Sequence, residues 1–260
     1  MPARFATCAL VLLLCCATQR KVPLRPQTSR DLSSVAFLAF SSSSADGFLD
    51  GQGRPCTPMR RERYAFAGWS SDEEDPACVH DTFDHGPQQA SLELRWRGII
   101  PADGSYEVIS GGYSLGAWGY VVARASYHGD YWAWARVIID VQSASCRGTW
   151  ALDLAKATIT GEATRGRLFS GWLEIPDIPV SGCKAGDGLE VRVQLLAQSN
   201  RGAIRVEAFG FWAPSKDELN RLFGIRPRQA ADPAAPLPID PGVPPLLWPR
   251  QMSTHGTPGL

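Results

Sequence analysis

The sequence has no surplus of charge of either sign. Lysine and arginine together number 26, aspartate and glutamate also number 26, and the formal net charge is zero. Proteins that bind nucleic acid or an acidic membrane surface through electrostatics carry a basic excess or a basic patch. The arginines here are scattered among apolar residues. We therefore expect no nucleic-acid partner.

The sequence is also poor in the residues and motifs that mark common enzymes. It has four histidines, and it contains no H-E-x-x-H motif and no glycine loop of the phosphate-binding type. Its two asparagines do not begin an N-x-[ST] sequon, so N-glycosylation is not expected. If the protein is a hydrolase, the better candidates are strand carboxylates such as Glu174 and Glu207, as in glycoside hydrolases.

No apolar run is long enough to span a bilayer comfortably. Residues 5–17 form a compact apolar stretch behind a single positive charge, Arg4. This pattern predicts a signal peptide over residues 1–17, with cleavage before Thr18. An organelle transit peptide is the alternative, because Arg20, Lys21, Arg25 and Arg30 also precede the first acid, Asp31. The preferred location is secreted or extracytoplasmic, with no membrane-spanning segment after signal removal.

Cysteine usage agrees with export. Three of the seven cysteines fall within the expected signal peptide, which leaves Cys56, Cys78, Cys146 and Cys183. An even number in an exported chain favours disulfides. Of the three connectivities, the local one pairs Cys56 with Cys78 and Cys146 with Cys183. A zinc site made of Cys56, Cys78, His80 and His85 is an alternative that matches no standard spacing.

The alternation of apolar and polar residues predicts an all-β protein. Residues 189–195 alternate most regularly, and similar short strands with turn signals recur from residue 91 to residue 212. We predict an antiparallel two-sheet β-sandwich, with jelly-roll and immunoglobulin-like strand orders not distinguishable. Ser215 with Glu218 forms a capping box, which predicts one short C-terminal helix.

These patterns divide the chain into four parts. Residues 18–54 are expected to be a mostly disordered extension, residues 55–225 the sandwich domain, and residues 226–260 a disordered proline-rich tail. A long polar loop over residues 70–89 is the acidic part of the domain. Its acids offer oxygen ligands for calcium, although no standard calcium loop is present; they are Asp72, Glu73, Glu74, Asp75, Asp81 and Asp84.

Residues 116–142 are predicted to be a long β-hairpin around a turn at residues 128–130, and residues 189–212 a second one. In the first hairpin, strand parity predicts one apolar core face. Its members are Trp118, Tyr120, Val122, Arg124, Tyr131, Ala133, Ala135, Val137, Ile139 and Val141. The other, mixed face is predicted to carry Tyr127, Trp132, Trp134 and Arg136, with Trp132 opposite Ala125.

Trp132, Trp134, Tyr127 and Arg136 are the candidate ligand-binding residues. Flat indoles stack on sugar faces, so the preferred function is an exported non-catalytic binding or structural module for a polysaccharide or a cell-surface protein. The competing interpretation is that these aromatics belong to an ordinary core. The alternative functions are a secreted hydrolase that uses carboxylates and a self-assembling surface or shell subunit, which would be a homo-oligomer. No cofactor is expected.

Overall fold

The computed structural model describes residues 32–58, 65–70, 77–82, 88–111, 113–124, 130–160, 164–213 and 215–228. All of them belong to one unit, which ends at Arg228. The expected signal peptide and most of the expected tail lie outside the described residues. No helix in the described part of the chain combines the length and the hydropathy needed to cross a membrane.

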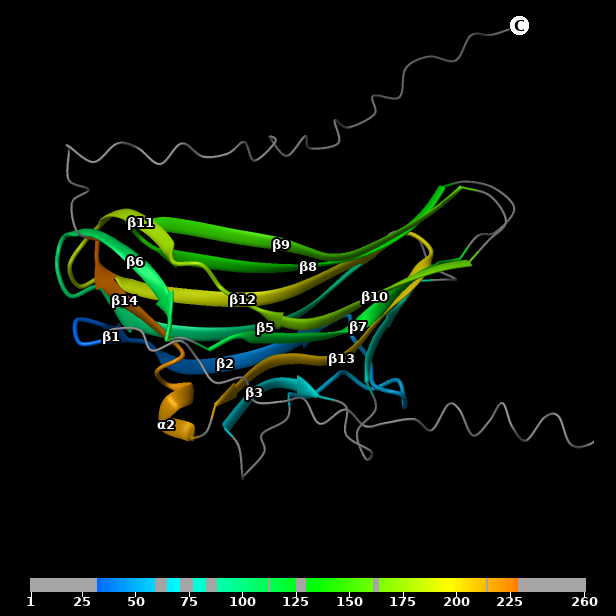
Figure 1. Cartoon of the computed structure of the whole chain (residues 1–260), viewed down its shortest axis with the longest axis horizontal. Helices are drawn as coiled ribbons and strands as arrows, with labels where there is room; N and C mark the ends of the chain where they lie inside the picture. The colour runs from blue at the N-terminus through cyan, green and yellow to red at the C-terminus, as the bar shows by residue number, and fades with distance from the viewer. Residues whose placement is uncertain are drawn as a thin grey trace, which may run out of the picture. The chain divides into compact units, whose positions relative to one another are not determined.

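One layer of the structure is a five-stranded antiparallel sheet, called the long sheet below (Figure 1). Its strands, in spatial order, are β2 (Ala39–Asp46), β5 (Gln88–Ile99), β12 (Gly188–Ser199), β8 (Asp130–Ser143) and β9 (Arg147–Thr160). The alternation of apolar and polar residues in 189–195 matches the alternation of burial along β12. Leu189, Val191, Val193 and Leu195 are buried, and Glu190, Arg192 and Gln194 are only half-buried.

Two shorter antiparallel sheets form the opposite layer. The first has the order β10 (Thr164–Leu173), β7 (Leu115–Arg124), β13 (Gly202–Ala213) and β3 (Ala65–Ser70), with β4 (Cys78–Asp81) also paired to β13. The second has the order β11 (Ile178–Cys183), β6 (Gly104–Ser110), β14 (Phe223–Pro227) and β1 (Ala36–Phe37). Three strands of the second sheet are next along the chain to strands of the first sheet: β11 to β10, β6 to β7 and β14 to β13. These matched strands follow the same order across the two sheets. The two sheets are therefore two parts of one broken layer.

Trp96 on β5 packs where the two parts of the broken layer meet. It is fully buried, and its ring lies edge-on to Phe211 of β13 at 5.6 Å and to Phe223 of β14 at 4.9 Å between ring centroids. Burial of aromatic side chains contributes strongly to core stability. The sandwich core is continuous along the long sheet, and the predicted all-β antiparallel sandwich is confirmed.

Both predicted disulfides are formed. Cys56 bonds to Cys78, and Cys146 in the β8–β9 turn bonds to Cys183 at the end of β11. The second bond therefore links the long sheet to the broken layer. Because Cys56 and Cys78 are oxidised, they are not available as the thiolate ligands of the alternative zinc site.

The two predicted hairpins are wrong as strand pairings. β7 pairs with β10 and β13, whereas β8 pairs with β12 and β9, so residues 116–142 connect the two layers instead of forming one ladder. β12 and β13 are likewise in different sheets. A Cβ added to Gly202, where β13 begins, would lie 2.4 Å from the carbonyl oxygen of Val122, so the close approach of this connection to β7 requires glycine.

The predicted core face is correct for β8 and wrong for β7. Ala133, Ala135, Val137, Ile139 and Val141 are buried as expected. On β7 the buried side chains are instead Ala117, Val121 and Ala123, while Trp118, Tyr120 and Val122 are half-buried on the other side. The parity argument assumed one ladder with a two-residue loop, and it does not apply when the connection crosses between layers.

Regular structure extends beyond the expected domain bounds of 55 and 225. β2 lies within the expected extension, β14 reaches into the expected tail, and β4 lies inside the long polar loop. The expected short helix is α2 (Lys216–Leu219), and the backbone N–H of Glu218 donates to Ser215 Oγ over 3.3 Å. The hydrogen bond to the N-cap side chain of the predicted capping box is therefore present.

Candidate functional site: the outer face of the long sheet

Trp132, Trp134 and Arg136 lie in line on the outer face of β8. They alternate with fully buried residues that face the core, and all three are half-buried. Successive outward residues on a strand are about 7 Å apart. The strand therefore presents two indoles and a guanidinium as one strip along its axis, which we call the aromatic strip. Tyr127 lies outside the described residues.

Asn200 holds the backbone of Trp132 in place. The N–H of Trp132 donates to Asn200 Oδ1 over 2.7 Å, and the N–H of Asn200 donates to the carbonyl oxygen of Trp132 over 3.1 Å. Asn200 follows the last residue of β12, so this pair of bonds extends the β8–β12 ladder by one position. It fixes the end of the strip where the chain leaves the long sheet.

Arg136 packs against Trp134 and is oriented by Asp153. Its guanidinium carbon lies 5.3 Å from the centroid of the Trp134 ring, within the range of a cation–π contact. Its Nε lies 2.5 Å from Asp153 Oδ1 on β9. The contact holds one side of the indole, and among the described residues the two Nη groups of Arg136 have no recorded partner.

The neighbours of Trp134 across the sheet are polar. Lys156 of β9 stands opposite on one side and Gln198 of β12 on the other, and the Gln198 amide donates to Gln89 Oε1 over 2.7 Å. Thr158 stands opposite Trp132. The strip is therefore flanked by hydrogen-bonding side chains and by no bulky apolar group in these two rows.

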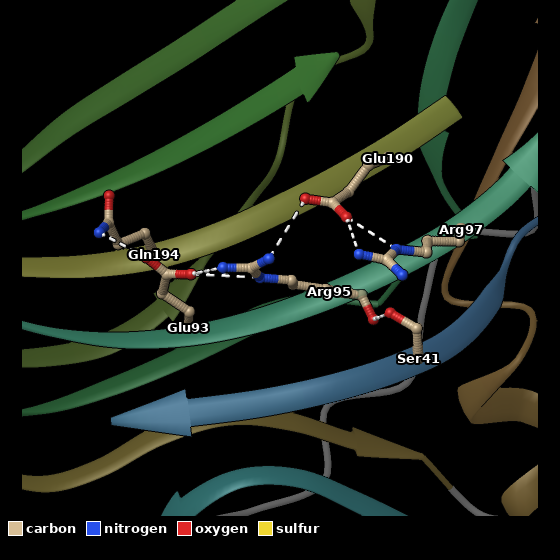
Figure 2. Close-up of polar contacts among 6 residues, drawn as sticks. All are labelled: Ser41, Glu93, Arg95, Arg97, Glu190 and Gln194. Carbon is tan, nitrogen blue, oxygen red and sulfur yellow. Dashed lines mark hydrogen bonds and ion pairs between the residues drawn. The ribbon is translucent and has the colours of Figure 1, made fainter. Parts of the chain in front are cut away.

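Further across the same face, β5 and β12 carry an internally paired charge ladder (Figure 2). Arg95 Nη2 lies 2.7 Å from Glu93 and Nη1 lies 3.7 Å from Glu190, while Arg97 Nη2 lies 2.7 Å from Glu190. The Gln194 amide donates to Glu93 Oε1 over 3.0 Å. The hydrogen bond that Arg95 donates to the Glu93 carboxylate raises the pKa of Arg95. These groups satisfy one another, and Arg192 of β12 lies between Arg95 and Asp140 in the adjoining strands.

A second tryptophan pair lies on the opposite layer. Trp118 of β7 and Trp172 of β10 are half-buried and meet edge-to-face, with ring centroids 5.1 Å apart. Leu168, also on β10, is 81% exposed. Sequence analysis assigned Trp118 to the core because it assumed that β7 and β8 formed one ladder. Each ring of this pair already contacts the other, unlike Trp132 and Trp134, which make no ring–ring contact within the described part of the chain.

The two candidate carboxylates of a hydrolase are far apart in register. Glu207 lies in the bulge of β13 beside Gly119, and Glu174 follows the end of β10 beyond Leu115. This offset of about four residues along β7 corresponds to roughly 15 Å at about 3.4 Å per residue. Paired carboxyl groups of glycosidases are about 5 to 10 Å apart. The register therefore does not favour this pair.

The residues considered above as alternative zinc or calcium ligands are not assembled as a site where the structure describes them. No group of three or more His, Cys, Asp or Glu side chains suited to a metal ion occurs among the described residues. His80 is buried, and its Nδ1 lies 2.9 Å from the carbonyl oxygen of Gly47, to which it donates. Asp81 is exposed, and the other acids of the polar loop over residues 70–89 lie outside the described residues.

Sequence analysis missed Lys156, Asp153 and Asn200. A bulge at Leu154 shifts the β8–β9 register by one residue, because Arg136 pairs with Asp153 but Ala135 pairs with Ala155. Without that bulge, Asp153 and Lys156 could not both face outward, since they differ by an odd number of positions. Counting strand pairs from the β8–β9 turn predicts that Asp153 lies opposite Arg136. The same count does not place Lys156 opposite Trp134, because that pairing depends on the bulge.

Comparison with known proteins assigns no family. No protein-family model matches the chain, and no curated protein matches it. Among solved structures, a chain from the structure of infectious bursal disease virus Gx strain aligns with 12% sequence identity over 80% of this chain and 73% of that chain. The TM-score is 0.15. At that score the alignment supports neither a shared fold nor a shared function.

Proposed function

We propose that the protein is an exported, non-catalytic binding module that holds a glycan along the aromatic strip. The observation that supports this most directly is the placement of Trp132 and Trp134, which are half-buried two residues apart on one strand of the outer sheet face. A core aromatic is covered by a second layer, and both indoles are on the outer side of the long sheet. An extended ligand lying along β8 would contact both rings.

The chemistry around the strip suits a sugar. A pyranose ring has an apolar face of C–H groups that packs on an indole, and a rim of hydroxyl groups that needs donors and acceptors. Gln198, Lys156 and Thr158 supply such groups in the rows of Trp134 and Trp132. The same set of groups is less suited to an apolar partner, because covering Lys156 and the amide without hydrogen bonds would be costly.

Export is part of this proposal. The apolar stretch at residues 5–17 has the length and flanking charge of a signal peptide. The two disulfides support an oxidising compartment, since such bonds persist mainly in exported proteins. A glycan ligand outside the cell agrees with both observations.

The test is binding of the purified chain to a panel of neutral and acidic polysaccharides, followed by tryptophan fluorescence and by affinity electrophoresis. We expect saturable retardation and protection of indoles from acrylamide quenching. The double variant Trp132→Ala/Trp134→Ala should lose about tenfold or more in affinity, because aromatic stacking contributes on the order of 1 kcal/mol per ring beyond buried area.

The matched control is Trp118→Ala/Trp172→Ala, which removes two half-buried indoles from the opposite layer. Both double variants must keep the wild-type circular dichroism spectrum. Binding that is lost only in the control variant would contradict the proposal and move the site to the broken layer. Absence of binding to every polysaccharide would contradict the glycan function itself.

A further inference from the structure

We infer that the glycan is a polyuronate, a polysaccharide with carboxylate groups, and that Lys156 and Arg136 recognise its charge. This inference rests on the proposed glycan-binding function and adds the chemical class of the ligand. It is based on which charges beside the aromatic strip are already paired and which are not.

Lys156 is the unpaired cation beside the aromatic strip. It lies directly opposite Trp134 on the edge strand β9, its side chain is exposed, and no hydrogen bond or ion pair is recorded for it within the described part of the chain. The bulge at Leu154 places it on this face. An ammonium group with three donors beside an indole can bind the carboxylate of a sugar whose ring packs on that indole.

Arg136 supplies a second cation with part of its donors in use. Its Nε contacts Asp153, and its guanidinium lies over Trp134. The planar guanidinium has five N–H donors and binds carboxylates through two of them when geometry allows. Because Trp134 and Asp153 already orient the group, less side-chain freedom is lost when a ligand binds its Nη atoms.

The charge balance of the strip favours one negative charge on the ligand. In the rows of Trp132, Trp134 and Arg136 on β8, β9 and β12, the described charged residues are Lys156, Arg136 and Asp153. Their sum is one positive charge. Of the other cations of the face, Arg95 and Arg97 are paired with Glu93 and Glu190 in the charge ladder, and Arg192 lies opposite Asp140, outside the rows of the strip. A singly charged carboxylate on a sugar matches this surplus better than a densely sulfated chain.

The experiment compares polygalacturonate with the same polymer after full methyl esterification, which removes the charge and keeps the sugar backbone. Binding of the full chain is measured by affinity electrophoresis and titration calorimetry at low and high salt. We expect the charged polymer to bind about tenfold tighter or better, with a difference that shrinks as salt increases. Heparin is included as the sulfated polymer.

Lys156→Ala should lower affinity for polygalacturonate about fivefold to tenfold and leave the esterified polymer unaffected, whereas Lys156→Arg should retain affinity. The matched control is Arg97→Ala, which removes an exposed cation of the same face that is paired with Glu190. It should leave the affinity for both polymers unchanged.

The outcomes separate the two proposals. Equal binding of charged and esterified polymer, still lost in Trp132→Ala/Trp134→Ala, would overturn the polyuronate inference and leave the glycan function standing. Preference for heparin over polygalacturonate would overturn the carboxylate assignment in the same way. If no polymer in either panel binds, both proposals fail.

Discussion

The indole Nε1–H of Trp96 donates a hydrogen bond to the carbonyl oxygen of Leu219 over 3.0 Å. Trp96 projects from the long sheet, and Leu219 is the last residue of α2, which lies between β13 and β14. The same indole contacts Phe211 and Phe223, one from each part of the broken layer. This single side chain therefore joins both layers and the helix that connects them.

Replacing Trp96 with phenylalanine should destabilise the fold by about 2 to 4 kcal/mol, since it leaves a cavity and removes the hydrogen bond to Leu219. The measurement is the free energy of unfolding from urea denaturation. The control is Trp150→Phe, because Trp150 on β9 is only half-buried. If both variants lose the same free energy of unfolding, Trp96 contributes no more to stability than the half-buried Trp150.

The sequence predicts which residues form strands much better than which strands are neighbours. Alternation in residues 189–195 identifies a strand and its buried face, because each inward residue packs on the core. It does not reveal whether the chain after Asn200 returns beside that strand or crosses to the other layer. Both connections place an apolar face toward the core, so the pattern of β12 and β13 is the same in either case.

The candidate site is predictable to a similar extent. Parity along β8 alone puts Trp132, Trp134 and Arg136 on one face, and the structure has them there. The partners of these residues depend on pairings across strands. The bulge at Leu154 brings Lys156 to the strip, and nothing in the local composition marks it.

Asn200→Ala should destabilise the protein by about 1 to 2 kcal/mol and weaken glycan binding, because the N–H of Trp132 would lose its acceptor. Asn220→Ala is the matched control. Asn220 Oδ1 accepts from the exposed N–H of Phe40 over 3.2 Å, where water can replace it. We expect the control to cost less than about 0.5 kcal/mol. The measurements are thermal unfolding and affinity electrophoresis, and equal effects would argue against a positioning role for Asn200.

Removing each disulfide should destabilise the fold by a different amount. The bonds close segments with sequence separations of 22 and 37 residues. Loop-closure entropy gives about 3.4 kcal/mol for Cys56–Cys78 and about 3.8 kcal/mol for Cys146–Cys183. Double Cys→Ala variants and urea denaturation measure both values. Wild-type protein denatured without reductant should also show no alkylation at these four cysteines by mass spectrometry, and alkylation there would contradict the pairing.

Tyr113 should titrate at unusually high pH in the folded protein. Burial raises the pKa of its phenol from 10.0 to about 12, and the neighbouring Glu218 carboxylate contributes to the increase. Because the folded pKa is above the unfolded one, the neutral phenol stabilises the fold fully below pH 10. That contribution is lost as the pH rises from about 10 to about 12.

The measurement is the ultraviolet absorbance of tyrosinate, taken as the difference between wild type and Tyr113→Phe across this pH range. Stability of the wild type should decrease more steeply between pH 10 and pH 12 than that of Tyr113→Phe. Glu218→Gln should lower the pKa of Tyr113, since it removes a nearby negative charge that disfavours the phenolate. An unchanged pKa in Glu218→Gln would mean that burial alone keeps the phenol neutral.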